Sequence, residues 1–185
     1  MGGNSDTLLS AALAGAEEAG AEIKRINVSG LRISGCTECN DCYALGECSI
    51  TDDDMGQIYD ALEWADRIIF ASPIFFMGLP SQAKALIDRC QRYWALKHVL
   101  GEEFPRPEGA PARFGIFIGV GATRGKKLFD GVILTMKYFF DAISMKPVED
   151  LYVLIRGIDE KGEISTNAEA LRSARESGGK LAAMD

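Results

Sequence analysis

The chain has 185 residues, of which 47% are hydrophobic and 25% are charged, with a formal net charge of −7. This composition is that of one globular domain with a substantial core, and it excludes disordered, collagen-like and low-complexity proteins. The acidic charge repels phosphate backbones and anionic lipids, and the basic residues at 124–127, Arg89 and Arg92 form only short patches, so we expect no nucleic-acid partner and no membrane partner.

Segments with a helical period alternate with short β-branched runs along the whole chain. Helices are predicted at residues 5–20, about 52–65, 83–94, 129–143 and 167–184. Strands are predicted at residues 22–33, 67–72, 114–120 and 148–155. This order predicts one α/β domain over residues 1–185, with a doubly wound parallel sheet and helices on both faces.

The longest apolar run, residues 68–80, contains two prolines and is too short to cross a bilayer. No secretory signal opens the chain, so we expect a cytoplasmic protein. The chain opens instead with the glycine turn Gly2–Gly3 directly before a predicted helix. In a doubly wound fold such a turn normally follows a strand, so we expect the first strand of the sheet to be missing from this chain.

The strongest chemical signal is a group of cysteines. Four of the five lie between residues 36 and 48, at Cys36, Cys39, Cys42 and Cys48. Tight clustering, an odd total and no signal peptide argue against disulfides. Two consecutive gaps of two residues let one loop present three thiolates to three corners of a cube, and the fourth cysteine reaches the remaining iron. We predict a [4Fe-4S] cluster here; zinc, or reduced cysteines without metal, stay open as alternatives. The fifth, Cys90, lies on an apolar helical stripe and is predicted to be a small buried hydrophobe.

Three glycine-rich or aromatic segments indicate a second site. Gly2–Thr7 opens a helix with free backbone amides, which favours a phosphate, although such a stretch also serves as a simple helix cap. Ser72–Gly78 and Gly119–Gly125 each follow a predicted buried strand, at the edge where open α/β sheets bind ligands. For Ser72–Gly78, the alternative is that the segment is only the end of a buried strand and binds no ligand. The two exits together predict a planar ligand between them.

These motifs together resemble those of the NADPH-dependent FMN reductase family, which has a flavodoxin-like fold. More narrowly, the chain resembles the iron-sulfur flavoproteins of anaerobic archaea and bacteria. The similar segments are GGNSDTLL, CTECNDCYALGECSITDDDM, SPIFFMGLPSQAKALIDR and GATRGKKLF. They span residues 2 to about 130.

The resemblance implies an oxidoreductase that carries electrons between a [4Fe-4S] cluster and FMN and then to an acceptor. It implies that the cluster ligands are Cys36, Cys39, Cys42 and Cys48, and that the phosphate turn of FMN is Gly3, Asn4 and Ser5. The residues that it places at the isoalloxazine ring are Pro73, Ile74, Phe75, Phe76, Met77, Gly78, Gly121, Ala122, Thr123 and Arg124. It further implies a homo-oligomer, a tetramer or a dimer, and a redox partner such as ferredoxin or NAD(P)H.

The chain departs from the family pattern in one respect, because a strand and a Ser-x-x-Arg segment do not precede GGNS. We expect the chain to begin downstream of that strand, which leaves the cysteine site intact. Two other functions fit the same residues. One is an NAD(P)H-dependent FMN or quinone reductase without a functional cluster, and the other is a metal-stabilised interaction module without flavin.

Overall fold

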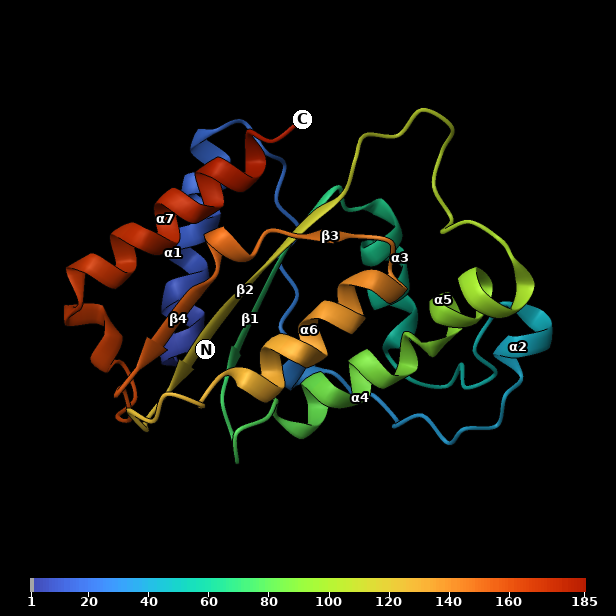
Figure 1. Ribbon diagram of the computed structural model, residues 1–185, viewed down its shortest axis with the longest axis horizontal. Coiled ribbons are helices and arrows are strands. Elements are labelled where there is room, and N and C mark those ends of the chain that lie inside the picture. The colour runs from blue at the N-terminus through green and yellow to red at the C-terminus, as the bar shows by residue number, and fades with distance from the viewer. Residues whose placement is uncertain (1) are drawn as a thin grey trace.

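A four-stranded parallel sheet runs through the computed structural model, which describes residues 2–185 (Figure 1). Its strands are β1 (Arg67–Pro73), β2 (Phe114–Gly121), β3 (Lys146–Pro147) and β4 (Val153–Arg156). Strand β2 pairs with β1 on one side and with β3 and β4 on the other. Every residue of β2 is buried, as its continuous apolar sequence predicts for a central parallel strand.

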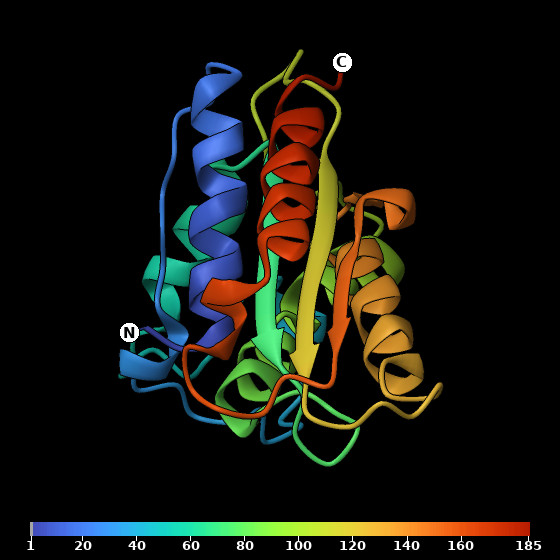
Figure 2. The same cartoon turned by 90° about the vertical axis from the view of Figure 1, so that its left-hand side faces the viewer.

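Helices cover both faces of the sheet (Figure 2). One face carries α1 (Asn4–Glu18) and α7 (Ala168–Ala182), and the other carries α3 (Met55–Trp64), α4 (Ser81–Arg89) and α6 (Asp130–Ala142). Because successive side chains of a strand point to opposite faces, Phe117 packs with α3 and α6 while Ile118 packs with α1 and α7. The remaining short helices are α2 (Cys42–Leu45), α5 (Gln91–Ala95), the π turn η2 (Leu96–Leu100), η1 (Val28–Gly30), η3 (Glu149–Leu151) and η4 (Glu163–Thr166).

The expected architecture is confirmed, because parallel strands alternate with helices that lie on both faces of the sheet. The helices expected from the periodicity are present, and the helix expected at 83–94 is divided at Cys90 into α4 and α5. Only the second half of the strand expected at 148–155 forms, as β4, because η3 occupies residues 149–151; the short strand β3 lies just before the expected strand. None of the helices described in residues 2–185 has the length and hydrophobicity that a membrane crossing requires.

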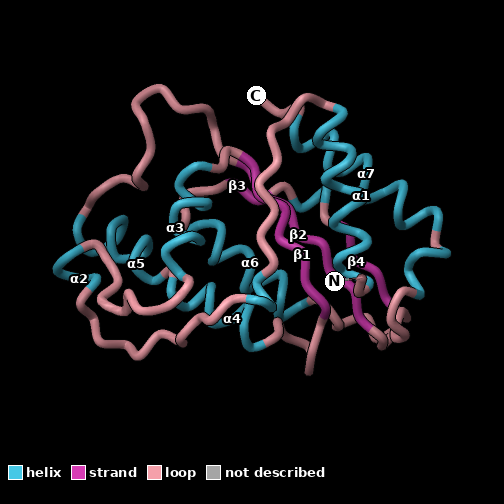
Figure 3. Tube along the Cα trace, turned by 180° about the vertical axis from the view of Figure 1, so that it is seen from behind, coloured by secondary structure: helices cyan, strands magenta, loops and turns pink. Residues whose placement is uncertain are grey.

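The strand expected at residues 22–33 is wrong. This segment runs beside the sheet without pairing, and only η1 is regular within it (Figure 3). An apolar groove of about 230 Å³ separates residues 21–28 from the free edge of β1. A strand forms only where a neighbour offers its backbone groups in register, and no described strand pairs with this segment.

Helices α1 and α7 approach each other closely because glycines lie at their contact. A Cβ atom at Gly178 would lie 1.9 Å from the carbonyl oxygen of Ala12, and one at Gly15 would lie 1.9 Å from that of Arg175. The backbones therefore touch where a side chain would force them apart. This contact fixes α1, whose first turn lies at the carboxyl edge of the sheet (Figure 2).

Replacing Gly178 with alanine should therefore lower the free energy of unfolding by about 1–3 kcal/mol, since the new methyl group overlaps backbone. The matched control is Gly56→Ala in α3, where a Cβ meets nothing within 4 Å and should stabilise the helix by up to about 1 kcal/mol. Urea unfolding of the three proteins measures both effects. Equal stability of the two variants would contradict the close contact.

Candidate functional site

The four clustered cysteines lie on an irregular segment that turns repeatedly. Glu38 and Asn40 have positive φ angles of 56° and 65°, and Gly46 ends α2 at φ 68°. These left-handed residues reverse the chain between successive cysteines, so that the cysteines turn toward a common space. All four cysteines line one cavity of about 580 Å³, whose other walls are α4, α5 and α6. Figures 1 and 3 show α2 lying beside α5 at this end of the molecule.

The chemistry of this donor set suits an iron-sulfur group. Cys36 and Cys39 are exposed and Cys42 and Cys48 are half-buried, so four soft sulfur ligands face one cavity. Within residues 2–185, no three His, Cys, Asp or Glu side chains are arranged to hold a metal ion. Burial, and then the charge on Cys48, raise the pKa of the Cys42 thiol, so binding a metal there would release protons.

Cys90 also borders this cavity, but its environment differs from that of the four clustered thiols. It is 1% exposed within the core between α4 and α5, and burial raises the pKa of its thiol far above the ordinary value. A thiol that stays protonated is a poor metal ligand. This position agrees with the sequence-based expectation of a small buried hydrophobe.

The segment is held to the core by Arg89, the last residue of α4. Its Nη1 lies 2.7 Å from Oδ2 of Asp53, and both side chains are almost completely buried. The same guanidinium donates to the carbonyl oxygens of Ser34 and Ile50, at 3.1 and 2.6 Å. Its Nε lies 3.2 Å from Sγ of Cys48. One side chain thus contacts the chain on both sides of the cysteines.

Asp53 completes this arrangement from the other side. Its carboxylate accepts the backbone N–H groups of Ser34 and Met55, at 2.8 and 3.0 Å, as well as the guanidinium. Burial opposes ionisation, but these hydrogen bonds outweigh it and lower the pKa of Asp53. Asp53 therefore binds the first backbone amide of α3 and the Arg89 guanidinium at once.

A second cavity, of about 630 Å³, lies at the carboxyl edge of the sheet. Three segments predicted to bind one ligand meet there. The lining residues that the sequence predicts are Gly3, Asn4, Ser5, Pro73, Ile74, Phe75, Gly121 and Ala122. Its volume falls within the range of small-molecule sites. Helix α1 begins at this cavity, and its N-cap Gly3 has no side-chain cap. The backbone amides of the first turn are therefore not capped by Gly3, and the carboxylate of Asp6 in the same turn also lines the cavity, where the amide of Gly2 and the guanidinium of Arg25 donate to it.

The rest of the predicted ring loops lies outside this cavity. Phe75 and Gly78 exchange two backbone hydrogen bonds of 2.9 Å across a tight turn. The central residues Phe76 and Met77 have φ angles of 51° and 62°, and the side chain of Phe76 is fully exposed. Thr123 does not line the cavity, and Arg124 lies against Gly157.

Several lining residues were not predicted from the sequence. Asn27, Ser29, Gln82, Asp159 and Lys161 also face the cavity. Asp159 and Lys161 follow β4 at the same carboxyl edge. The rule that ligands bind where parallel strands end predicted the loops after β1 and β2, and it could have predicted these two residues as well. Asn4 has a second role, because its amide donates to Glu160 and accepts from the backbone of Ile164. It joins the first turn of α1 to the loop after β4.

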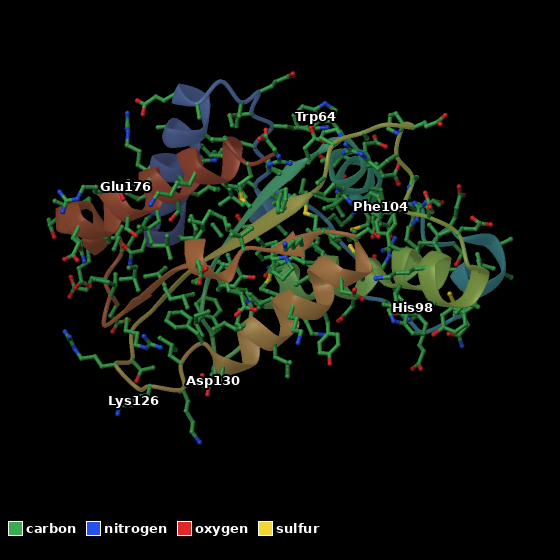
Figure 4. All side chains as sticks on the ribbon, turned by 45° about the horizontal axis from the view of Figure 1, so that its top comes forward. Trp64, His98, Phe104, Lys126, Asp130 and Glu176 are labelled. Atoms are coloured by element: carbon green, nitrogen blue, oxygen red, sulfur yellow. The ribbon has the colours of Figure 1, made fainter. Side chains whose placement is uncertain are left out.

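Helix α4 connects the two cavities. Gln82 and Ala83 at its start line the cavity at the sheet edge, and Lys84, Ile87 and Arg89 line the cysteine cavity. Seven residues of an α-helix separate Gln82 from Arg89, a rise of roughly 10 Å. Figure 4 shows Lys126 and Asp130 in the region that follows β2, and His98 toward the other end of the molecule, near the cysteine segment.

The family model described as NADPH-dependent FMN reductase matches residues 1–157. The chain belongs to this family. The family expected from the motifs is therefore confirmed, and with it the flavodoxin-like fold class.

Similar curated proteins are iron-sulfur flavoproteins of archaea. One from Methanocaldococcus jannaschii is 32% identical over 134 residues, which cover 71% of this chain and 62% of that protein. One from Archaeoglobus fulgidus is 37% identical over 91 residues, covering 49% of this chain and 41% of that protein. The matched parts thus span about half the length of these relatives.

Solved structures show the same fold at low sequence identity. A flavone reductase has a TM-score of 0.68 at 21% identity, with 97% of this chain and 58% of that chain covered. The NAD(P)H:quinone oxidoreductase of Methanothermobacter marburgensis has a TM-score of 0.67 at 17% identity, with 96% of this chain and 88% of that chain covered.

The Asp53–Arg89 pair predicts a specific pH dependence. The pKa of Asp53 in the folded protein lies below its ordinary value of 3.8, so the stabilisation is complete above that pH and is lost as pH falls through the folded value. Asp53→Asn should lower the free energy of unfolding by about 3–5 kcal/mol at neutral pH, because Arg89 is left buried without a counter-ion.

Urea unfolding of wild type and Asp53→Asn across a range of pH measures this. The difference should be constant near neutrality and shrink below about pH 4, where Asp53 of the unfolded chain takes up a proton, until Asp53 of the folded protein is protonated as well. The control is Asp54→Asn. The wild-type Asp54 carboxylate accepts the exposed backbone amide of Arg32, so this substitution should lower the free energy of unfolding by about 1 kcal/mol. A difference that does not change with pH would contradict the ionised pair.

Proposed function

We propose that this protein is an FMN-dependent oxidoreductase that also holds a [4Fe-4S] cluster and moves electrons between the two groups and an external partner. Bound FMN exchanges one or two electrons and a [4Fe-4S] cluster exchanges one. The proposal assigns FMN to the cavity at the sheet edge and the cluster to the cysteine cavity.

The proposal rests on one observation above all, which is that residues of helix α4 line both cavities. A helix of nine residues contributes its start to one cavity and its end to the other. Electron transfer through protein slows steeply with distance, so two redox groups are useful only when they are near each other. Gln82 and Arg89, which line one cavity each, are separated by a rise of roughly 10 Å along α4, and this proximity of the two cavities supports exchange within one chain.

The FMN assignment rests on the chemistry of the first cavity. The free amides at the start of α1 suit the phosphate, since a helix N-terminus favours an anion. The apolar exits of β1 and β2 suit a flat ring, and Pro73 and Gly121 bring backbone to its edge. Asn27, Ser29 and Gln82 add polar groups that can bind the ribityl hydroxyls.

The cluster assignment rests on the four thiols that line a common cavity and on the iron-sulfur flavoproteins to which the chain is similar. Each cysteine of a cubane binds a different iron, so its sulfur ligands stand farther apart than the ligands of a single ion. A cavity lined by all four cysteines therefore suits a cluster.

Self-association is part of the proposal, as a dimer or tetramer. Large apolar side chains are exposed around the cysteine cavity, with Leu45 at 67% and Tyr138 at 65% exposure, and Trp94 also exposed. Burying them against another copy would remove apolar surface from water. The redox partner, such as ferredoxin or NAD(P)H, is proposed from the family alone.

The FMN assignment predicts a phosphate-specific loss on changing Ser5 to aspartate. A carboxylate in the first turn stabilises the helix but repels the phosphate, so the Kd for FMN should rise at least about tenfold. Riboflavin, which lacks the phosphate, should bind the variant and wild type equally. Fluorescence titration of the flavin-free proteins measures both constants.

The control is Ser10→Asp, which places the same charge on α1 outside the cavity lining and should leave both affinities unchanged. Equal weakening of FMN and riboflavin in Ser5→Asp would remove α1 from the phosphate site.

The cluster assignment predicts that Cys42→Ala loses the iron while it keeps the flavin. Protein purified anaerobically should hold about four irons per chain in the wild type, in line with one iron per thiolate ligand, and far fewer in the variant. The matched control is Cys90→Ala, which removes the buried fifth cysteine and should keep its iron. Iron analysis and the absorbance spectrum measure both. Full iron content in Cys42→Ala would show that the ligand assignment is wrong.

A further inference from the structure

Arg89 has the most deeply buried cationic side chain among the described residues. Its side chain has no exposed surface, and that of its partner Asp53 is 2% exposed. Burying a charged pair is costly unless every polar group finds a partner. Arg89 meets this condition, because each of its three guanidinium nitrogens donates a hydrogen bond.

The hydrogen bonds of Arg89 reach two kinds of acceptor, oxygen atoms and one cysteine sulfur. Three acceptors are oxygens of Ser34, Ile50 and Asp53, which would satisfy the terminal nitrogens by themselves. The remaining Nε–H group points at the sulfur of Cys48, at 3.2 Å. The planar guanidinium fixes all these directions together, so the position of the sulfur is tied to the carbonyl groups on both sides of the cysteine segment.

We propose that Arg89 is a positioning residue that fixes Cys48 and stabilises negative charge on its sulfur, and thereby raises the reduction potential of the cysteine site. The inference rests on the proposed cluster. One electron added to that site increases the negative charge on its sulfur atoms. A buried positive charge and a hydrogen bond to a ligand sulfur favour the more negative state. Removing them should therefore make reduction harder.

The other charged and titratable groups near this contact do not replace Arg89. Asp53 is shared between the guanidinium and two backbone amides. The Tyr59 hydroxyl donates to the carbonyl oxygen of Arg89, and burial raises the pKa of Tyr59 well above its usual range, so that this group stays neutral. Asp88 pairs with Lys84 on the exposed side of α4. Only the Arg89 side chain donates from a cation to a cysteine sulfur among the described hydrogen bonds.

Two substitutions separate charge from geometry. Arg89→Lys keeps the positive charge and loses the planar fork, whereas Arg89→Gln loses both. The control is Arg113→Gln. Arg113 is also buried, and it donates to three backbone carbonyls, those of Leu62, Ala65 and Ile143, but none of its hydrogen bonds in the described part of the chain reaches a cysteine.

The first measurement is the one-electron reduction potential of anaerobically purified protein, by titration with dithionite and detection of the reduced state by electron paramagnetic resonance. Arg89→Gln should disfavour reduction about tenfold, a shift of about 59 mV to more negative potential. Arg89→Lys should shift it less, and Arg113→Gln should leave it unchanged. An unchanged potential in Arg89→Gln, or the same shift in Arg113→Gln, would overturn the proposal.

The second measurement uses metal-free protein and does not depend on the cluster. Amide hydrogen exchange at Ser34 and Met55 should be at least about tenfold faster in both Arg89 variants than in wild type or Arg113→Gln, because the anchor of Asp53 is lost. Unchanged exchange would overturn the positioning role. A wild-type protein that binds no iron would refute the proposed cluster and the effect on potential together, and exchange would still decide the positioning role.

Arg89→Gln leaves Asp53 buried without its partner and can prevent folding. The double variant Asp53→Asn with Arg89→Gln removes both charges, so that no unpaired charge is buried. It should show the same direction of shift in potential and the same faster exchange at Ser34. A double variant that keeps the wild-type values of both would equally overturn the proposal.

Discussion

The buried pair of Arg89 and Asp53 is the interaction on which the cysteine end of the molecule depends. The segment from Cys36 to Cys48 is polar and largely exposed, so it cannot be held by a hydrophobic core of its own. The guanidinium and the carboxylate together bind backbone groups before and after the cysteines. The loop is therefore held in shape by the protein itself, which would lower the ordering cost of binding the proposed cluster.

The parallel sheet provides the second constraint. Because all strands end at one edge, the exits of β1 and β2 and the start of α1 meet in one cavity. The close contact of α1 with α7 through Gly15 and Gly178 holds the first turn of α1 at that edge. Helix α4 then leads from this edge to Arg89. The same short element thus positions both cavities, so that a change in its packing would act on both.

Much of this could be predicted from the sequence because the signals are local. Helical periodicity identified the helices, and the continuous apolar run 114–120 identified the central strand. The spacing of the cysteines and the rule for strand exits correctly brought Cys36–Cys48 to one cavity and Gly3, Pro73 and Gly121 to another. Which groups these residues bind remains a prediction.

What could not be predicted depends on distant contacts. Residues 22–33 have an alternating apolar pattern, but a strand needs a neighbour in register, and β1 lies across a groove from them. Arg89 looked like a surface cation because charge alone does not show burial; its acceptors come from Ser34, Ile50 and Asp53, far away in the chain. The hydrogen bonds between the Asn4 side chain and the loop after β4 could not be predicted either, because Glu160 and Ile164 are also far from Asn4 in the chain.

We propose that one chain carries two redox groups in cavities joined by α4. X-ray diffraction from anaerobically grown crystals, recorded on both sides of the iron absorption edge, would locate both groups. We expect iron anomalous density in the cavity lined by Cys36, Cys39, Cys42 and Cys48, together with flavin density between Gly3 and Gly121. A zinc signal in place of iron, iron bound elsewhere, or flavin at another surface would contradict it.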